Sequence, residues 1–96
     1  MENIDGKTLK QKINNGEQLT IIDVRSNEDF EKGHINGAVN IPMMTLGMEA
    51  ENLDNEKPVV VYCRTGKKSV GASLFLEDMG FKVYNLKGGY SEYINS

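Results

Sequence analysis

The residue with the clearest chemical potential in this sequence is its single cysteine, Cys63. It follows the apolar run 59–62 and precedes a helical pattern, so it should lie at the carboxyl end of a strand, where open α/β folds place ligand sites. The segment after it carries three cations and no acid: Arg64, Thr65, Gly66, Lys67, Lys68 and Ser69. Gly66 can let successive N–H groups turn inward as an anion-binding nest, and the dipole of the following helix points into the same space.

These neighbours predict a reactive thiol. A thiol at a helix N-terminus beside cations has its pKa lowered from about 8.5 to roughly 3.5 to 7.5, which makes it a thiolate near neutral pH. A free cysteine without such neighbours more often behaves as a small buried hydrophobic residue. We therefore expect Cys63 to be a nucleophile that attacks an anionic substrate.

Other polar residues offer weaker candidates. Asp23 and Arg25 follow the apolar run 19–22 and should reach the same edge of the sheet as Cys63. We expect them to pair with each other or to hold the active loop, since charges at strand ends often form structural ion pairs. His34 lacks a partner motif and is interpreted as structural rather than as a general base. The pair Gly88-Gly89 is interpreted as a tight turn and not as a nucleotide-binding motif.

Composition excludes several classes of function. One cysteine cannot form an internal disulfide, and with the one histidine it cannot complete a zinc site from soft ligands, so we expect no metal and no cofactor. The formal net charge of −3 gives no basic field for nucleic acid or an anionic membrane surface, and neither partner is expected. Without a membrane-length apolar run or a signal-peptide pattern at the start, the expected location is cytoplasmic.

Short β-branched runs alternate with helical patterns along the chain. We predict strands over 19–22, 38–41, 59–62 and 82–86, and helices over 8–14, 27–32 and 67–79. The strand runs are nearly continuous rather than alternating, which is typical of a sheet buried on both faces. The order therefore predicts an α/β fold with an open parallel sheet and helices on both faces.

The last of these helices should be amphipathic. Its apolar residues recur at i, i+3, i+4 and i+7, and are Ala72, Phe75, Leu76 and Met79. We predict that this set forms the buried face and that Gly80 ends the helix. Met43, Met44 and Met48 are interpreted as core filling, and residues 49–57 as a solvated connection.

Three motifs in order resemble the rhodanese-like domain family. The first comprises Ile22-Asp23-Val24-Arg25, Glu28-Asp29-Phe30, Gly33-His34-Ile35, Gly37-Ala38 and Asn40-Ile41-Pro42. The second, Val61-Tyr62-Cys63-Arg64-Thr65-Gly66-Lys67-Lys68-Ser69, is similar to the active-site loop of the family, and the third is Leu86-Lys87-Gly88-Gly89-Tyr90. The resemblance spans about 4–94, nearly the whole chain.

The resemblance implies a single rhodanese-like domain over 1–96 with a five-stranded parallel sheet. It implies that Cys63 is the catalytic residue and that the side chains and backbone of residues 64–69 cradle the substrate. The implied activity is sulfur transfer: Cys63 takes sulfane sulfur from thiosulfate or a related donor as a persulfide and passes it to cyanide, a thiol or an acceptor protein. Lys68 departs from the arginine found in many of these sulfurtransferases, which leaves donor preference open.

Two other functions remain as alternatives. A cysteine-dependent phosphatase or arsenate reductase would place an arginine six positions after the cysteine, where this chain has Ser69. A non-catalytic or sulfur-carrier module would use the same fold without efficient turnover. Because there is no second cysteine, a persulfide on Cys63 must pass its sulfur to an outside acceptor.

Overall fold

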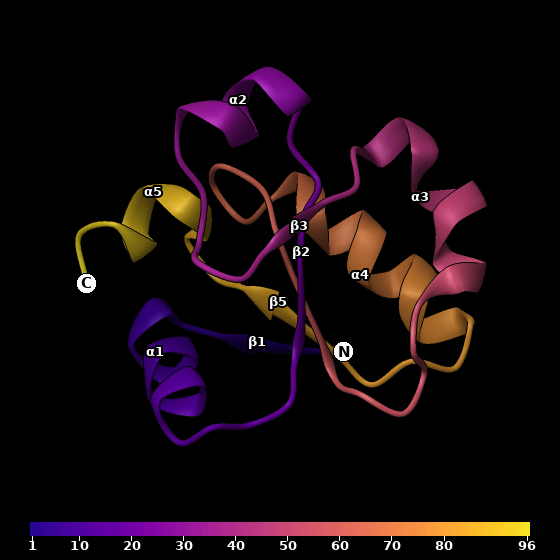
Figure 1. Ribbon diagram of the computed structural model, residues 1–96, viewed down its shortest axis with the longest axis horizontal. Helices are drawn as coiled ribbons and strands as arrows, with labels where there is room; N and C mark the ends of the chain where they lie inside the picture. The colour runs from indigo at the N-terminus through magenta and orange to yellow at the C-terminus, as the bar shows by residue number, and fades with distance from the viewer.

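The computed structural model covers all 96 residues and contains one five-stranded parallel sheet in the order β1-β5-β4-β2-β3. The strands are β1 (Glu2–Ile4), β2 (Thr20–Asp23), β3 (Val39–Asn40), β4 (Val59–Tyr62) and β5 (Val83–Leu86). The helices are α1 (Gly6–Asn14), α2 (Asn27–Lys32), α3 (Met43–Glu49), α4 (Lys68–Asp78) and α5 (Gly89–Tyr93), with a short 3₁₀ helix at Ala50–Asn52. The predicted parallel sheet with helices on both faces is confirmed (Figure 1).

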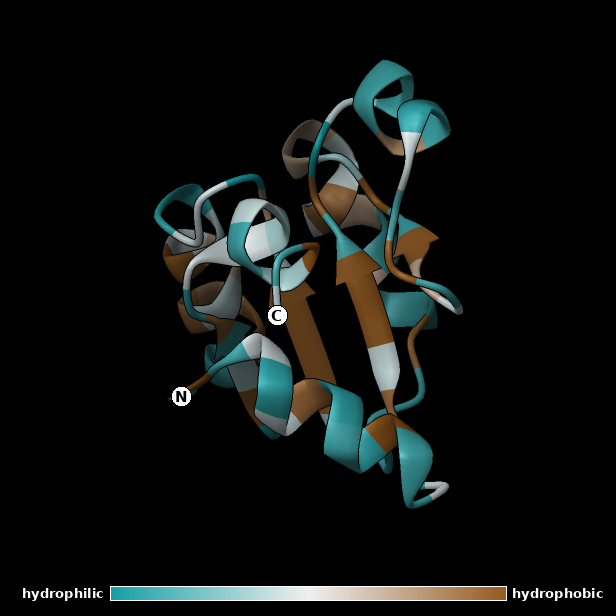
Figure 2. Cartoon of the chain, turned by 90° about the vertical axis from the view of Figure 1, so that its left-hand side faces the viewer, coloured by the Kyte–Doolittle hydropathy of each residue, from teal (hydrophilic) through white to brown (hydrophobic).

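The sheet separates two apolar clusters. One is formed by side chains of β2, β4 and β5 together with α3, the 3₁₀ helix and α4, and it includes Cys63. The other lies on the opposite face, where α1 and α5 pack against β1, β4 and β5. Strand β4 is buried at every residue because it has helices on both sides and strands on both edges. In Figure 2 the strands are largely brown, whereas the helices that cover them carry far more teal.

Strand β1 was not predicted, because its residues carry no apolar run. Glu2 and Asn3 are exposed, and only Ile4 turns into the core. The strand lies at one edge of the sheet and pairs with β5 alone, so its backbone hydrogen bonds rather than its side chains define it. A three-residue edge strand of this kind leaves no hydrophobic signal in the sequence.

The predicted buried face of α4 was half wrong. Ala72 and Leu76 are buried, but Phe75 is 41% and Met79 39% exposed. The face that packs on the sheet instead repeats through Ser69, Ala72, Ser73 and Leu76, which is the same helical spacing shifted toward the start of the helix. The two serines are accommodated because Ser69 Oγ donates to Asn85 Oδ1 of β5 at 2.6 Å and Ser73 Oγ donates to the Ser69 carbonyl oxygen at 2.8 Å.

Two further interpretations were wrong. The methionines of α3 do not fill the core, since Met44 is 95% and Met48 80% exposed, and Met43 borders a cavity. The segment 49–57 is not wholly a solvated connection, because the 3₁₀ helix buries Ala50 against the sheet. Leu46 is the one buried residue of α3, and the methionines lie on the exposed sides of that helix.

Candidate active site

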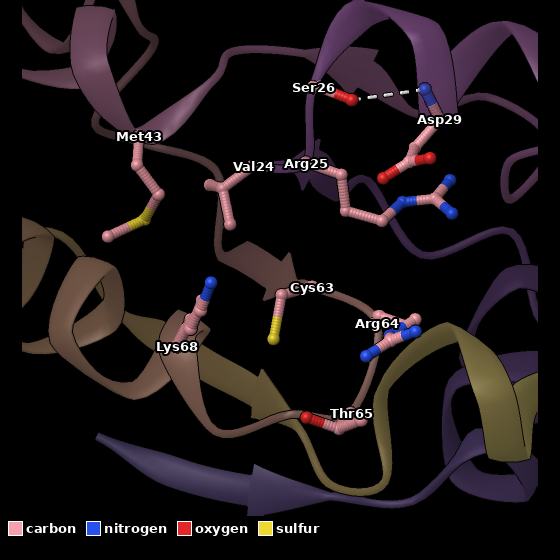
Figure 3. A pocket seen from close by; sticks show the side chains of 9 residues that line it. All are labelled: Val24, Arg25, Ser26, Asp29, Met43, Cys63, Arg64, Thr65 and Lys68. Carbon is pink, nitrogen blue, oxygen red and sulfur yellow. Dashed lines mark hydrogen bonds between the residues drawn. The ribbon is translucent and has the colours of Figure 1, made fainter.

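Cys63 lies immediately beyond β4 and five residues before α4, at the carboxyl edge of the sheet. The register pairs Asp23 of β2 with Tyr62 of β4, so the residues that follow these two strands reach the same place. There they border a cavity of about 510 Å³ lined by Val24, Arg25, Ser26, Asp29, Met43, Cys63, Arg64, Thr65 and Lys68. Figure 3 shows the Cys63 thiol between Lys68 and Arg64, with Met43 and Val24 on the opposite wall.

Backbone donors point at the Cys63 sulfur. The N–H of Gly66 lies 3.2 Å and the N–H of Ser69 3.4 Å from Sγ. Gly66 has φ of +85°, and a Cβ at this position would come within 2.8 Å of the Leu86 carbonyl oxygen. The loop therefore requires glycine here, and this conformation is what turns its N–H toward the sulfur.

These donors lower the pKa of the Cys63 thiol. Burial raises that pKa, hydrogen bonds from the N–H groups of Ser69, Thr65 and Gly66 lower it, and the pKa lies below its ordinary value. The lowered pKa agrees with the expectation from the sequence, which attributed it to the helix N-terminus and to the cations beside the thiol. Hydrogen bonds from the loop and from the start of α4 are the causes in the structure, and the cationic side chains are not among them.

The cations of the loop are divided between two cavities. Arg64 and Lys68 line the cavity that contains Cys63, and neither forms an ion pair. Lys67 instead lines a second cavity, which lies on the side of the loop facing β1 and α1 and also includes Lys87 and Glu92. Residues 64–69 are thus brought together as one loop, but its two lysines face different spaces.

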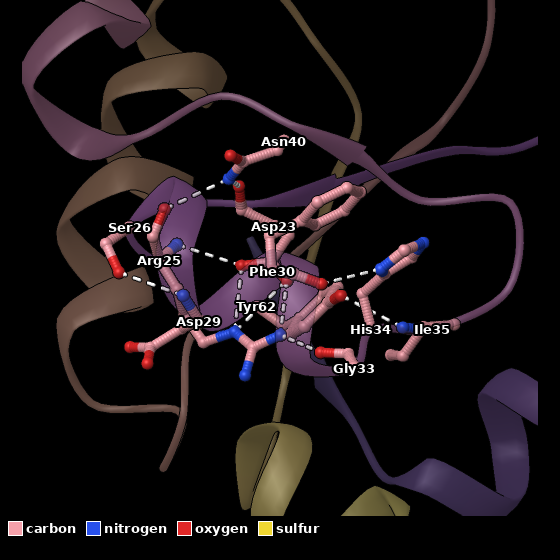
Figure 4. Close-up of polar contacts among 10 residues, drawn as sticks. All are labelled: Asp23, Arg25, Ser26, Asp29, Phe30, Gly33, His34, Ile35, Asn40 and Tyr62. Carbon is pink, nitrogen blue, oxygen red and sulfur yellow. Dashed lines mark hydrogen bonds and ion pairs between the residues drawn. The ribbon is translucent and has the colours of Figure 1, made fainter.

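Asp23 and Arg25 form a buried ion pair beside the cavity (Figure 4). Arg25 Nη2 lies 2.7 Å from Asp23 Oδ2, Arg25 Nε lies 3.0 Å from Asp23 Oδ1, and Asp23 is fully buried. Arg25 Nη2 also donates to the Gly33 carbonyl oxygen at 2.7 Å. The guanidinium lies over the Tyr90 ring, 4.5 Å from its centroid, and over Tyr62 at 5.7 Å. This pair therefore ties the end of β2 to the start of α5, which begins within the third motif.

Tyr62 supports the site without a signal in the sequence. Its hydroxyl accepts a hydrogen bond from the N–H of Ile35 at 3.1 Å, and burial is the main cause of the raised pKa of this phenol. His34 is exposed, stacks on Phe30 with centroids 3.7 Å apart, and donates from Nδ1 to the Phe30 carbonyl oxygen. It is not among the residues that line the cavity, which supports its structural interpretation.

The backbone that follows the Gly88-Gly89 turn forms hydrogen bonds with the cysteine loop. The N–H groups of Tyr90 and Ser91 donate to the carbonyl oxygens of Cys63 and Arg64, each at 2.9 Å. A Cβ on Gly89 would lie 2.6 Å from both of those carbonyl oxygens, so the two backbones meet with no room for a side chain. The interpretation as a tight turn is confirmed, and the turn also supports the loop that carries Cys63.

Sequence reasoning missed Asn85, a residue of β5 that is 2% exposed. Its Oδ1 accepts a hydrogen bond from the Ser69 hydroxyl at 2.6 Å, and its Nδ2 donates to the Gly66 carbonyl oxygen at 3.1 Å. The signal available in the sequence was an amide inside the apolar run 82–86, because a buried polar side chain must find hydrogen-bond partners.

No three His, Cys, Asp or Glu side chains are grouped as a metal ion would require. No helix has both the length and the apolar character needed to span a membrane.

Comparison with known proteins agrees with this architecture. The family model described as "Rhodanese-like domain" matches residues 5–96. The provisionally named sulfurtransferase YtwF of Bacillus subtilis is 38% identical over 89 residues, covering 93% of this chain and 86% of that protein. The thiosulfate sulfurtransferase GlpE of Coxiella burnetii is 40% identical over 76 residues, covering 78% and 71%. The crystal structure of a rhodanese-related protein from Thermoplasma volcanium superposes with a TM-score of 0.91 at 27% identity, covering 99% and 92%. The chain belongs to the rhodanese-like domain family.

Proposed function

We propose that this protein is a sulfurtransferase that carries sulfane sulfur as a persulfide on Cys63. The Cys63 thiolate attacks the outer sulfur of thiosulfate or a related donor, the sulfur–sulfur bond of the donor breaks, and sulfite leaves with the electron pair. A thiolate acceptor or cyanide then attacks the outer sulfur of the persulfide and regenerates the Cys63 thiolate. Each step forms one bond to sulfur and breaks one, so no external oxidant or reductant is needed.

The observation that carries this proposal is the pair of backbone N–H groups aimed at Cys63 Sγ. They stabilise a thiolate before any substrate binds, so attack on sulfur requires no general base. They also remain available to a persulfide, whose terminal sulfur bears the negative charge after the first step. The names of the relatives support the same activity, since one is a thiosulfate sulfurtransferase.

Arg64 and Lys68 are the residues to which we assign binding of the anionic donor. Both line the cavity beside Cys63 and both are free of ion pairs, so their charges are available to the sulfonate oxygens of a thiosulfate. Lys67 lines the other cavity, and we assign it only a long-range contribution to the local positive potential. Thr65 borders the cavity, while Gly66 and Ser69 contribute through their N–H groups. Asp23 and Arg25 support the site through their ion pair.

Phosphate chemistry is disfavoured by the residue that stands six positions after the cysteine. Ser69 is fully buried and its hydroxyl is bonded to Asn85, so no arginine fork is available there to clasp a tetrahedral oxyanion. A cytoplasmic location, a single domain over 1–96 and the identity of the acceptor, whether cyanide, a small thiol or an acceptor protein, stay predictions from the sequence.

Intact-mass measurement tests the proposed function directly. The purified protein is incubated with thiosulfate and its mass is compared with that of Cys63→Ser treated in the same way. We expect a gain of one sulfur atom in the native protein, removable by dithiothreitol, and no gain in the variant. No adduct in the native protein, or the same adduct in both proteins, would overturn the persulfide intermediate.

A further inference from the structure

A buried chain of hydrogen bonds connects the Cys63 thiol to strand β5. Ser69 Oγ lies 3.4 Å from Cys63 Sγ on one side and 2.6 Å from Asn85 Oδ1 on the other. Both Ser69 and Asn85 are almost completely buried, at 0% and 2% exposure, and no buried side-chain nitrogen or oxygen lacks a partner. The Ser69 hydroxyl is therefore the side-chain link between Cys63 and this amide, and the backbone of Gly66 provides a second connection.

The direction of this chain is fixed by the backbone. Asn85 Nδ2 lies 3.1 Å from the carbonyl oxygen of Gly66, which can only accept, so the amide nitrogen must face that oxygen. Its Oδ1 consequently faces Ser69 and can only accept from the hydroxyl. Because a serine hydroxyl has one proton, donation to Asn85 turns the lone pairs of Ser69 Oγ toward the Cys63 sulfur.

This orientation acts differently on the two protonation states of the cysteine. A protonated Cys63 can donate its S–H to the lone pairs of Ser69 Oγ. A Cys63 thiolate has no proton to donate, so its negative charge faces those lone pairs without a hydrogen bond. To stabilise the thiolate, the hydroxyl must turn away from Asn85, which leaves Oδ1 buried without a donor. The side chain of Ser69 and its N–H thus have opposite effects, since the N–H donates to the sulfur in either state.

We propose that Asn85 is a positioning residue that holds the proton of the Ser69 hydroxyl away from Cys63 and thereby limits the fraction of Cys63 present as thiolate. The proposal rests on the proposed function in that the thiolate is the attacking group. It predicts that the loop is not tuned for the greatest possible thiolate fraction. Because nucleophilicity falls as thiol pKa falls, a moderated pKa keeps the sulfur a better nucleophile.

Charged groups also face Cys63, and the variants below leave them unchanged. They are Arg25 from the segment after β2, Asp29 from α2, Arg64 from the cysteine loop and Lys68 from the first turn of α4. Asn3 on β1 and Gly66 are the other partners of Asn85 and carry no charge. A change in the pKa of Cys63 on altering Asn85 or Ser69 therefore does not come from a lost side-chain charge.

The test is the pKa of Cys63, measured from the pH dependence of its alkylation by iodoacetamide, in four variants. In Ser69→Ala we expect the pKa to fall by about one, a tenfold gain in thiolate below the pKa, because the thiol loses its acceptor. In Asn85→Leu, of similar volume, we expect a fall of similar size, because the freed hydroxyl can donate to the thiolate. A rise in the pKa of Ser69→Ala would overturn the proposal, since it would mean that the hydroxyl already stabilises the thiolate.

A double variant separates positioning from simple disruption of the loop. If Asn85 acts through Ser69, then adding Asn85→Leu to Ser69→Ala should change the alkylation rate by less than about threefold at any pH. Asn3→Ala, which removes the other side-chain partner of Asn85, should leave the pKa unchanged. A full effect of Asn85→Leu in the Ser69→Ala background, or an equal effect of Asn3→Ala, would contradict the proposal.

Alkylation does not require sulfur transfer, so the two proposals can fail separately. If thiosulfate gives no persulfide while the pKa values follow this pattern, the proposed function is wrong and the role of Asn85 stands. If the persulfide forms but Asn85→Leu leaves the pKa of Cys63 unchanged, the function stands and the role of Asn85 is wrong.

Discussion

Replacing Gly66 by alanine should damage both the fold and the reactivity of Cys63, by amounts that can be measured separately. Gly66 has φ of +85°, and a Cβ there would lie 2.8 Å from the Leu86 carbonyl oxygen and 2.9 Å from the Gly88 nitrogen. The left-handed conformation costs an alanine about 1–2 kcal/mol. Since the two close atoms belong to backbone, overpacking adds about 1–3 kcal/mol. We therefore expect the free energy of unfolding in urea to fall by about 2–5 kcal/mol.

The same substitution should raise the pKa of the Cys63 thiol. The N–H of Gly66 lies 3.2 Å from Sγ, and a shifted loop would lose this donor. A hydrogen bond to a charged group contributes about 1.5–3 kcal/mol, and a pKa change of one corresponds to about 1.4 kcal/mol. The pKa should therefore rise by about 1–2, and alkylation by iodoacetamide below that pKa should slow by about tenfold to a hundredfold.

Gly16→Ala is the matched control for Gly66→Ala. Gly16 has a similar φ of +74°, but a Cβ there meets nothing within 4 Å. It should cost only the conformational energy of about 1–2 kcal/mol and leave the alkylation of Cys63 unchanged. Equal losses of stability in the two variants, or a native pKa of Cys63 in Gly66→Ala, would refute the reasoning.

Three further predictions concern charge. Asp23→Asn should lower the free energy of unfolding by about 3–5 kcal/mol, because it leaves the buried guanidinium of Arg25 without its charged partner. Glu28→Gln, which removes an exposed ion pair, should change that free energy by less than about 1 kcal/mol, and similar urea midpoints for the two variants would contradict this. The pKa of the Cys63 thiol is lowered in the folded protein, so alkylation should reach its plateau at a lower pH in the folded chain than in the chain unfolded in urea. The free energy of unfolding should rise with pH between the pKa of Cys63 in the folded chain and its pKa in the unfolded chain. A plateau at the same pH in both states would refute it. Lys68→Ala should raise the KM for thiosulfate about tenfold and Lys67→Ala should raise it less than about threefold, because of these two lysines only Lys68 lines the Cys63 cavity. Equal effects of the two variants in steady-state assays would refute the assignment of donor binding to Lys68.

The elements that position Cys63 could be predicted because their sequences are strongly patterned. The run 59–62 is buried on both faces, and the residue after it necessarily falls at the carboxyl edge of a parallel sheet. Ser26 directly precedes the predicted helix 27–32 and is its N-cap, since its Oγ accepts from the N–H of Asp29 at 3.2 Å. Local chemistry and tertiary structure agree at these positions, so the sequence alone was sufficient.

The polar interior of the site could not be predicted, because it depends on which residues meet across the sheet. The apolar spacing of α4 favoured Phe75 over Ser69 and Ser73, yet the two serines are buried because partners exist for them. Asn85 is separated from Ser69 by sixteen positions, and the packing of α4 against β5 brings them together. Lys67 and Lys68 are neighbours in sequence, but the start of α4 turns them toward different cavities.

Under the proposed function, the groups that activate Cys63 differ from the groups that bind the anionic donor. Backbone N–H groups of the loop lower the pKa of Cys63, and these groups are uncharged and held in place by the conformation of Gly66. The cations Arg64 and Lys68 line the cavity and form no ion pair, so they can bind a donor without being needed to create the thiolate. A lysine at position 68 in place of an arginine should therefore change which anionic donors are bound, through the loss of a bidentate fork, while leaving the nucleophile itself almost unaltered. Donor preference can then vary among chains of this kind without disturbing the loop that makes the sulfur reactive.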